Sequence, residues 1–127
     1  MNKRLSISLI FFICSFAFNF AYGAQIICDT DVSNSQSQLR IESNDDTYAV
    51  SKIDLPGGFR LAGQYLPSRT KFKLYVYINS KDRYVLLSAQ EFIVNPKACS
   101  RSFGDNLVYG EPYERDLFFQ CRQICKD

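Results

Sequence analysis

Polar and apolar residues alternate most regularly over residues 69–79 of this chain. One set of alternate positions begins with Thr70 and is otherwise apolar: Thr70, Phe72, Leu74, Val76 and Ile78. The other set is basic, aromatic or polar: Arg69, Lys71, Lys73, Tyr75, Tyr77 and Asn79. A period of two sustained over this length is typical of a strand with one buried and one solvated face. The pattern therefore predicts a β-strand over residues 69–79.

Two hairpins are predicted around this strand. A polar connection at residues 79–82 leads into residues 83–94, which are rich in Tyr, Val, Leu and Ile, and we expect this hairpin at the centre of the sheet. Residues 38–43 also alternate, residues 44–46 form a turn cluster, and residues 47–55 continue as a strand. Two more segments are expected to be strands, residues 24–28 and residues 59–66, the latter ending before Pro67.

The C-terminal segment, residues 113–125, fits two structures. An apolar stripe fits a helix that begins near Pro112, and it comprises Leu117, Phe118, Cys121, Ile124 and Cys125. Leu117, Phe119 and Cys121 instead fit a strand, and we favour the helix. Residues 99–106 are expected to form a loop. The predicted fold is mainly β, a small antiparallel sheet or sandwich of about five to seven strands with a short C-terminal helix.

The first 23 residues have the composition of a secretory signal peptide. Lys3 and Arg4 precede an apolar run over residues 5–20, and small residues flank Tyr22 before a cleavage point at Ala24. An uncleaved anchor is the alternative, but the run is shorter than the about 20 residues that a spanning helix needs. We therefore expect residues 24–127 to be one exported domain, periplasmic or secreted, with no membrane span after cleavage.

Four cysteines remain after Cys14 is removed with the leader: Cys28, Cys99, Cys121 and Cys125. An even number in an exported chain predicts two disulfides, and the sequence alone leaves the pairing open. Cys121 and Cys125 are close in sequence, so we expect each to bond elsewhere, one to Cys28 and one to Cys99. A zinc site would need tighter cysteine pairs or histidine. We expect no metal and no cofactor.

The charge of the expected mature domain is balanced. Removing Lys3 and Arg4 from 15 bases and 13 acids leaves a net charge of zero, which argues against nucleic acid as a partner. The charges are unevenly distributed. Residues 24–54 hold six acids and two bases, whereas residues 55–101 hold two acids and eight bases. The middle of the chain is therefore basic.

Several kinds of catalysis are disfavoured because the chain contains no histidine. Histidine-dependent nucleophile systems and most catalytic transition-metal sites are excluded, and no phosphate-binding or hydrolase motif is present. A pair of carboxylates could still hydrolyse glycosides. The candidates are Glu91, Asp105, Glu111 and Glu114. We interpret Glu91 more simply as a solvated strand residue.

The basic and aromatic face of the strand over residues 69–79 is the candidate partner-binding site. It comprises Arg69, Lys71, Lys73, Tyr75 and Tyr77, and Arg60 and Arg83 would widen it if their strands are neighbours. Such side chains suit an acidic protein or a glycan, although a solvated sheet face is the simpler interpretation. The sequence favours a non-enzymatic binding protein with an inhibitor, immunity or envelope role. The alternatives are a small carboxylate hydrolase or effector, and a subunit of a surface assembly with a long exposed apolar edge.

Overall fold

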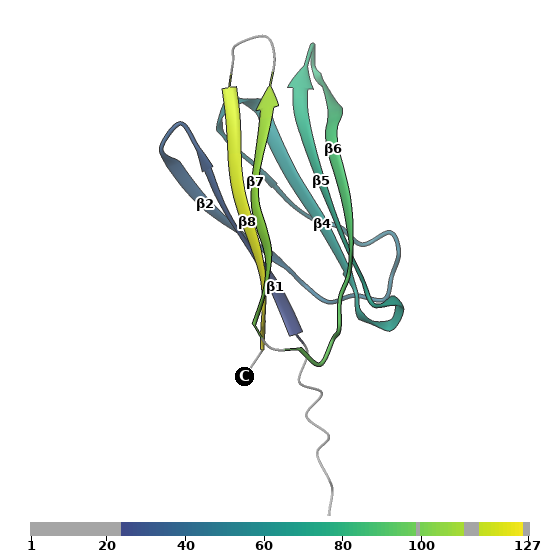
Figure 1. The fold of residues 1–127 in the computed structure, drawn as a ribbon. Coiled ribbons are helices and arrows are strands. Elements are labelled where there is room, and N and C mark those ends of the chain that lie inside the picture. Colours follow the sequence, from purple (N-terminus) through teal and green to yellow (C-terminus); the bar gives the residue numbers. More distant parts are fainter. Residues whose placement is uncertain (1–23, 99, 111–114, 126–127) are drawn as a thin grey trace, which may run out of the picture.

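The computed structural model describes residues 24–98, 100–110 and 115–125 and contains eight strands in these ranges (Figure 1). The strands are β1 (Ala24–Val32), β2 (Ser35–Ile41), β3 (Ser51–Asp54), β4 (Phe59–Leu66), β5 (Lys71–Ser80), β6 (Arg83–Ile93), β7 (Arg101–Gly110) and β8 (Arg115–Cys125). Two 3₁₀ turns, η1 (Pro56–Gly58) and η2 (Pro67–Arg69), flank β4. No helix in the described ranges has the length and hydropathy needed to cross a bilayer.

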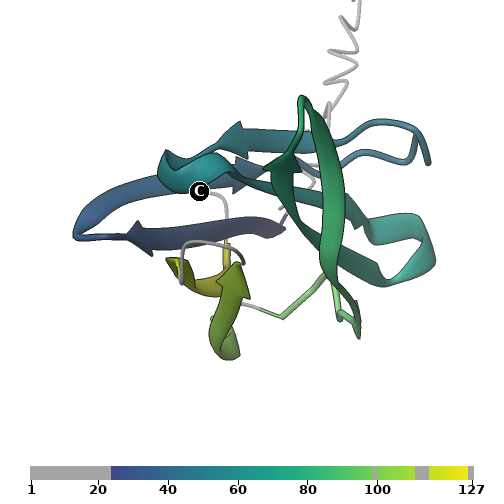
Figure 2. The same cartoon turned by 90° about the horizontal axis from the view of Figure 1, so that it is seen from above.

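The strands form two antiparallel sheets of four strands each. The terminal sheet has the order β2-β1-β8-β7, and the central sheet has the order β3-β4-β5-β6. Seen from above, the strands of both sheets surround a common interior (Figure 2). The mainly β prediction is confirmed, and the structure is a sandwich.

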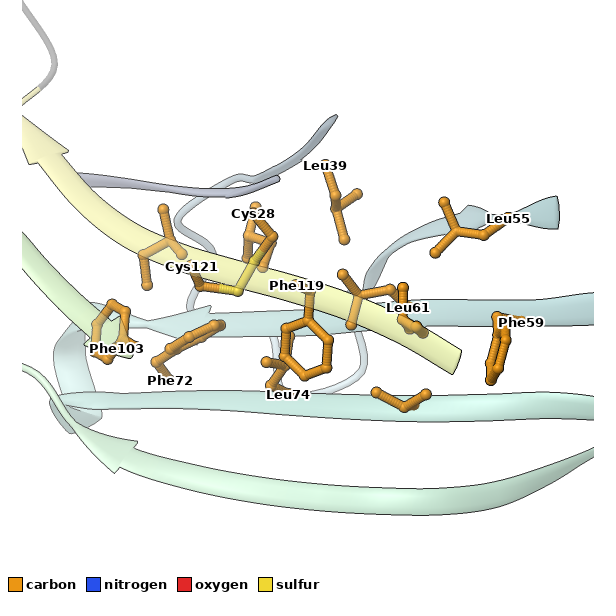
Figure 3. Close-up of a cluster of buried hydrophobic side chains, with 14 of the residues drawn as sticks. Cys28, Leu39, Leu55, Phe59, Leu61, Phe72, Leu74, Phe103, Phe119 and Cys121 are labelled. Atoms are coloured by element: carbon orange, nitrogen blue, oxygen red, sulfur yellow. A yellow bond between two sulfur atoms is a disulfide. The ribbon is translucent and has the colours of Figure 1, made fainter. Parts of the chain in front are cut away.

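The inner faces of both sheets supply one hydrophobic core (Figure 3). Phe59, Leu61, Phe72 and Leu74 from the central sheet are at most 2% exposed, and Phe119 from β8 is fully buried. Burying apolar area contributes about 25 cal/mol per Å², so residues of this size dominate the stability of a small domain.

The two sheets approach each other closely at Gly63 on β4. A Cβ atom built on Gly63 would lie 2.4 Å from Cδ1 of Ile41, which is on the terminal sheet. Gly110 at the end of β7 has a similar role, because its Cβ would lie 2.6 Å from Cδ1 of Ile78. The absence of a side chain at these positions therefore lets the sheets pack directly.

The predicted C-terminal helix is wrong, and the eight strands exceed the expected five to seven. Residues 115–125 form β8, which pairs with β1 on one side and β7 on the other. Its inward positions include Gln123, whose side-chain Nε2 donates to the backbone oxygen of Asn95 at 2.9 Å. A buried glutamine interrupts the apolar alternation, and pairing with distant strands decides the structure of the segment.

The loop expected over residues 99–106 is also wrong, since β7 begins at Arg101. The register of β7 against β8 shifts between Ser102 and Asp105, and Gly104 there has a φ of 83°. This irregularity inserts one extra residue into β7 relative to β8 and breaks the alternation of β7 in the sequence.

The first predicted hairpin is wrong as well. β2 pairs with β1 and β3 pairs with β4, so residues 42–50 connect the two sheets. A tight turn at Ser33 and Asn34, with φ of 50° and 65°, instead joins β1 to β2. The second hairpin is confirmed as β5 and β6, but β6 lies at the edge of the central sheet rather than at its centre.

One disulfide joins Cys28 on β1 to Cys121 on β8. The two residues are directly opposite each other in the sheet register, so the expectation that Cys121 bonds outside its own segment is confirmed. Cys125 is also disulfide-bonded. Cys99 and the expected leader, residues 1–23, lie outside the described residues.

Candidate binding surface

The candidate residues of β5 lie on the outer face of the central sheet. Lys71, Lys73, Tyr75 and Tyr77 are each partly exposed, and the inward positions between them are buried. Arg69 belongs to η2, so it lies beside this row and not within the strand as expected. We call the outward residues of this sheet that carry the basic and aromatic groups the basic–tyrosine face; they are Arg60, Lys71, Lys73, Tyr75, Tyr77 and Tyr84.

Arg60 joins this face from β4, where it is paired in register with Tyr77. Its Nε donates to Oδ1 of Asp54 at 2.5 Å, and its guanidinium carbon lies 3.7 Å from the ring centroid of Tyr84. The hydrogen bond from Arg60 lowers the pKa of Asp54, and the same bond raises the pKa of Arg60. These contacts hold the guanidinium in one position and make a cation–π pair on the surface.

Arg83, the other residue expected to widen the face, does not join it. It begins β6 opposite Ser80, whereas the outward residues of β5 are Tyr77 and Asn79. Arg83 is therefore not in register with an outward residue of β5. The tertiary structure therefore brings together Arg60 and the β5 row and leaves Arg83 at the end of the hairpin.

Tyr75 lies at the centre of the face and is partly exposed. Its partners in register are Ala62 on β4 and Ala89 on β6, and both have small side chains. Its ring centroid is 6.4 Å from that of Tyr77, and a shallow hollow of about 170 Å³ beside it is lined by Lys73, Ala89 and Glu91 among others. The ring therefore offers a large contact area with few rotatable bonds.

Lys71 and Lys73 differ in their partners. Lys71 lies 3.3 Å from Glu91 in an exposed ion pair. Among the described residues, none forms an ion pair with Lys73 within 4.0 Å. Lys73, next to Tyr75, is therefore the cation of β5 that a partner's carboxylate can engage without displacing an existing pair.

The candidate carboxylates are not brought together. Glu91 is paired with Lys71 on the central sheet, whereas Asp105 lies on β7 of the terminal sheet and accepts a hydrogen bond from Gln120. Glu111 and Glu114 lie outside the described residues. Within the described ranges, no group of three or more His, Cys, Asp or Glu side chains is placed to hold a metal ion.

The outer face of the terminal sheet carries a second feature that sequence reasoning missed. One row in register crosses all four strands and consists of Gln38, Asp29, Gln120 and Asp105. Beside it is a shallow hollow of about 530 Å³, which Asp29, Asp31, Gln38 and Phe118 help to line. These residues come from both ends of the chain, so only the pairing of β1 with β8 brings them together.

Asp29 is the centre of this row. Its carboxylate accepts a hydrogen bond from Nε2 of Gln38 at 2.9 Å and a second from the guanidinium of Arg122. The Gln38 bond is the larger cause of a lowered pKa for Asp29, and Arg122 adds to it. The row is therefore polar and fixed by contacts between neighbouring strands.

Comparison of the chain with models of known protein families, with curated proteins and with solved structures finds no match.

Proposed function

We propose that this protein is a small exported binding protein that acts by surface contact, in an inhibitor, immunity or envelope role. The basic–tyrosine face is its binding surface, and an acidic protein is its partner. The observation that carries the proposal is the position of Tyr75, partly exposed on the outer face between two alanines and next to Lys73. Tyrosine supplies contact area at low entropic cost, and the cations steer an acidic surface to it.

The fixed position of Arg60 supports the same proposal. Its contacts with Asp54 and Tyr84 mean that little side-chain freedom remains to be lost when a partner binds. Ordering a flexible side chain at an interface costs about 0.5–1.5 kcal/mol, and a pre-ordered one avoids most of this cost.

The proposal is tested by replacing Lys71, Lys73, Tyr75 and Tyr77 together with serine. The mature protein is used as bait on envelope extracts, and captured proteins are identified by mass spectrometry. We expect the replacement to abolish capture of an acidic protein while the protein still folds, because the four side chains lie on the outer face and none is fully buried. The matched control replaces Gln36 and Arg40 on the terminal sheet, both exposed. Capture that survives the first replacement would contradict the proposal.

A second candidate, a subunit of a surface assembly, is favoured by the edge of the central sheet. β6 is an edge strand of 11 residues. Its consecutive residues Val85, Leu86 and Leu87 are 37%, 50% and 38% exposed. Exposed apolar edges of this kind are templates for pairing with another strand. Replacing Leu86 and Leu87 with lysine would abolish assembly through this edge, and native gels of the two proteins check it.

A further inference from the structure

The two outer faces of the sandwich carry opposite charge. The outward positions of the terminal sheet hold four acids and two bases: Asp29, Asp31, Asp105, Asp116, Arg40 and Arg122. Those of the central sheet hold four bases and two acids: Lys52, Arg60, Lys71, Lys73, Asp54 and Glu91. Two four-stranded faces with opposite net charge therefore lie on the two sides of one domain.

The ion pairs within each face do not cancel the charge difference between the two faces. Arg122 pairs with Asp29, Arg60 with Asp54, and Lys71 with Glu91. Among the described residues, these pairs account for both acids of the central face and for one of the four acids of the terminal face. The remaining carboxylates include Asp31 and Asp116, which line one shallow hollow of about 230 Å³ on the terminal sheet.

Exposed apolar groups surround those carboxylates. Leu107 and Phe118 are opposite each other on β7 and β8 and are 63% and 40% exposed, and Tyr109, paired with Asp116, is 60% exposed. We call Asp31, Asp116, Leu107, Phe118 and Tyr109 the acidic–aromatic face. Its carboxylates are complementary in charge to the lysines near Tyr75, and its exposed apolar side chains can pack against the tyrosine rings there.

We propose that the acidic–aromatic face of one copy binds the basic–tyrosine face of a second copy of this chain. This inference rests on the proposed function and names the partner of the same surface. Asp31 and Asp116 face Lys73 of the neighbour and Lys52, which lies on β3 beside the basic–tyrosine face, and Phe118 packs against Tyr75. Complementary potentials favour this docking and disfavour the pairing of two like faces.

The geometry makes the contact head-to-tail. The two faces belong to different sheets on opposite sides of the domain, so each added copy leaves one face of each kind uncovered (Figure 1). Heterologous contacts of this type continue into rings or open filaments.

The test uses the mature chain with its disulfides intact, in sedimentation velocity runs over a range of protein and NaCl concentrations. A terminal-face variant carries Asp31→Ser and Phe118→Ser, and a central-face variant carries Lys73→Ser and Tyr75→Ser. A control variant carries Lys81→Ser, which removes a charge from the β5–β6 turn. We expect association of the native chain that weakens with salt, and association at least about tenfold weaker in each face variant but not in the control.

A mixture of the two face variants gives the sharpest result. Each retains the face that the other lacks, so an equimolar mixture should form heterodimers that do not grow further. A native chain that is monomeric at every concentration overturns the proposal, as does association that both variants leave unchanged, which would indicate pairing through β6. If the native chain is monomeric but the central-face variant loses capture of another acidic protein, the self-association is wrong and the proposed function stands.

Discussion

The two sheets of this sandwich are assembled from the chain in different ways. The central sheet uses β3, β4, β5 and β6, which follow one another in the sequence and pair with their neighbours. The terminal sheet places β1 beside β8, and its disulfide joins residues 93 positions apart. One sheet is therefore local in sequence and the other is not.

This difference predicts how each sheet gains stability. Closing a long loop costs conformational entropy before any contact forms, and this cost falls on the pairing of β1 with β8. The Cys28–Cys121 bond lies in that pairing and removes much of the same entropy from the unfolded chain. The disulfide therefore lies in the strand pairing that has the largest entropic cost of loop closure.

The largest expected effect comes from removing this link. The variant Cys28→Ala with Cys121→Ala should lose about 4 kcal/mol of unfolding free energy, because a loop of about 100 residues is no longer closed in the unfolded state. Urea denaturation measures the loss. Hydrogen exchange of the same variant should show amides of β1 and β8 losing more protection than those of β4 and β5.

Equal loss of protection in both sheets would contradict the distinction drawn between them. Wild-type protein treated with a reductant is the control, since it also opens the bond at Cys125. It should be at least as unstable as the double variant.

A smaller effect is expected where the two sheets touch. Gly63→Ala should cost about 1–2 kcal/mol, because the new methyl group would overlap Ile41, which is fully buried. The nearest atom is the terminal Cδ1 of Ile41, at 2.4 Å. Ile41→Val removes that atom, so the double variant should be more stable than the sum of the two single effects predicts. Thermal or urea unfolding of the four proteins tests this, and simple additivity would show that the sheets do not pack directly at this point.

The smallest effect compares a carboxylate from each sheet. Asp29 and Asp54 both have a lowered pKa, from the Gln38 and Arg60 hydrogen bonds respectively. Each therefore contributes stability at pH above its unfolded value near 3.8, and this contribution is lost as the pH falls through the lower folded pKa. The Asp29 side chain is 45% exposed, so solvent screening limits its contribution to less than about 1 kcal/mol.

The measurement is the urea midpoint of wild type, Asp29→Asn and Asp54→Asn as a function of pH. Both variants should be less stable than wild type near neutral pH and should approach it at acidic pH. A difference that stays constant across the acid range would show that these carboxylates do not stabilise the folded state through their charge.

The sequence by itself determined the local patterns. The alternation around Phe72, Leu74 and Val76 predicted β5 and its two faces, because side chains of a strand alternate whatever its neighbours are. It also predicted the Tyr75 and Lys73 row of the candidate site, and that Cys121 bonds outside its own segment. The helix predicted over residues 113–125 was wrong. Gln123 occupies an inward position of β8 and donates a hydrogen bond to Asn95, and no local pattern in the sequence reveals this long-range contact.

Only the tertiary structure decided which strands are neighbours. It placed Arg60 and Tyr84 together on the basic–tyrosine face, and it brought Asp31 from β1 beside Phe118 from β8. It also left β6 at an edge. The physical reason is that strand pairing and sheet packing depend on contacts between residues far apart in the chain, whereas the alternation of a strand depends only on its own backbone.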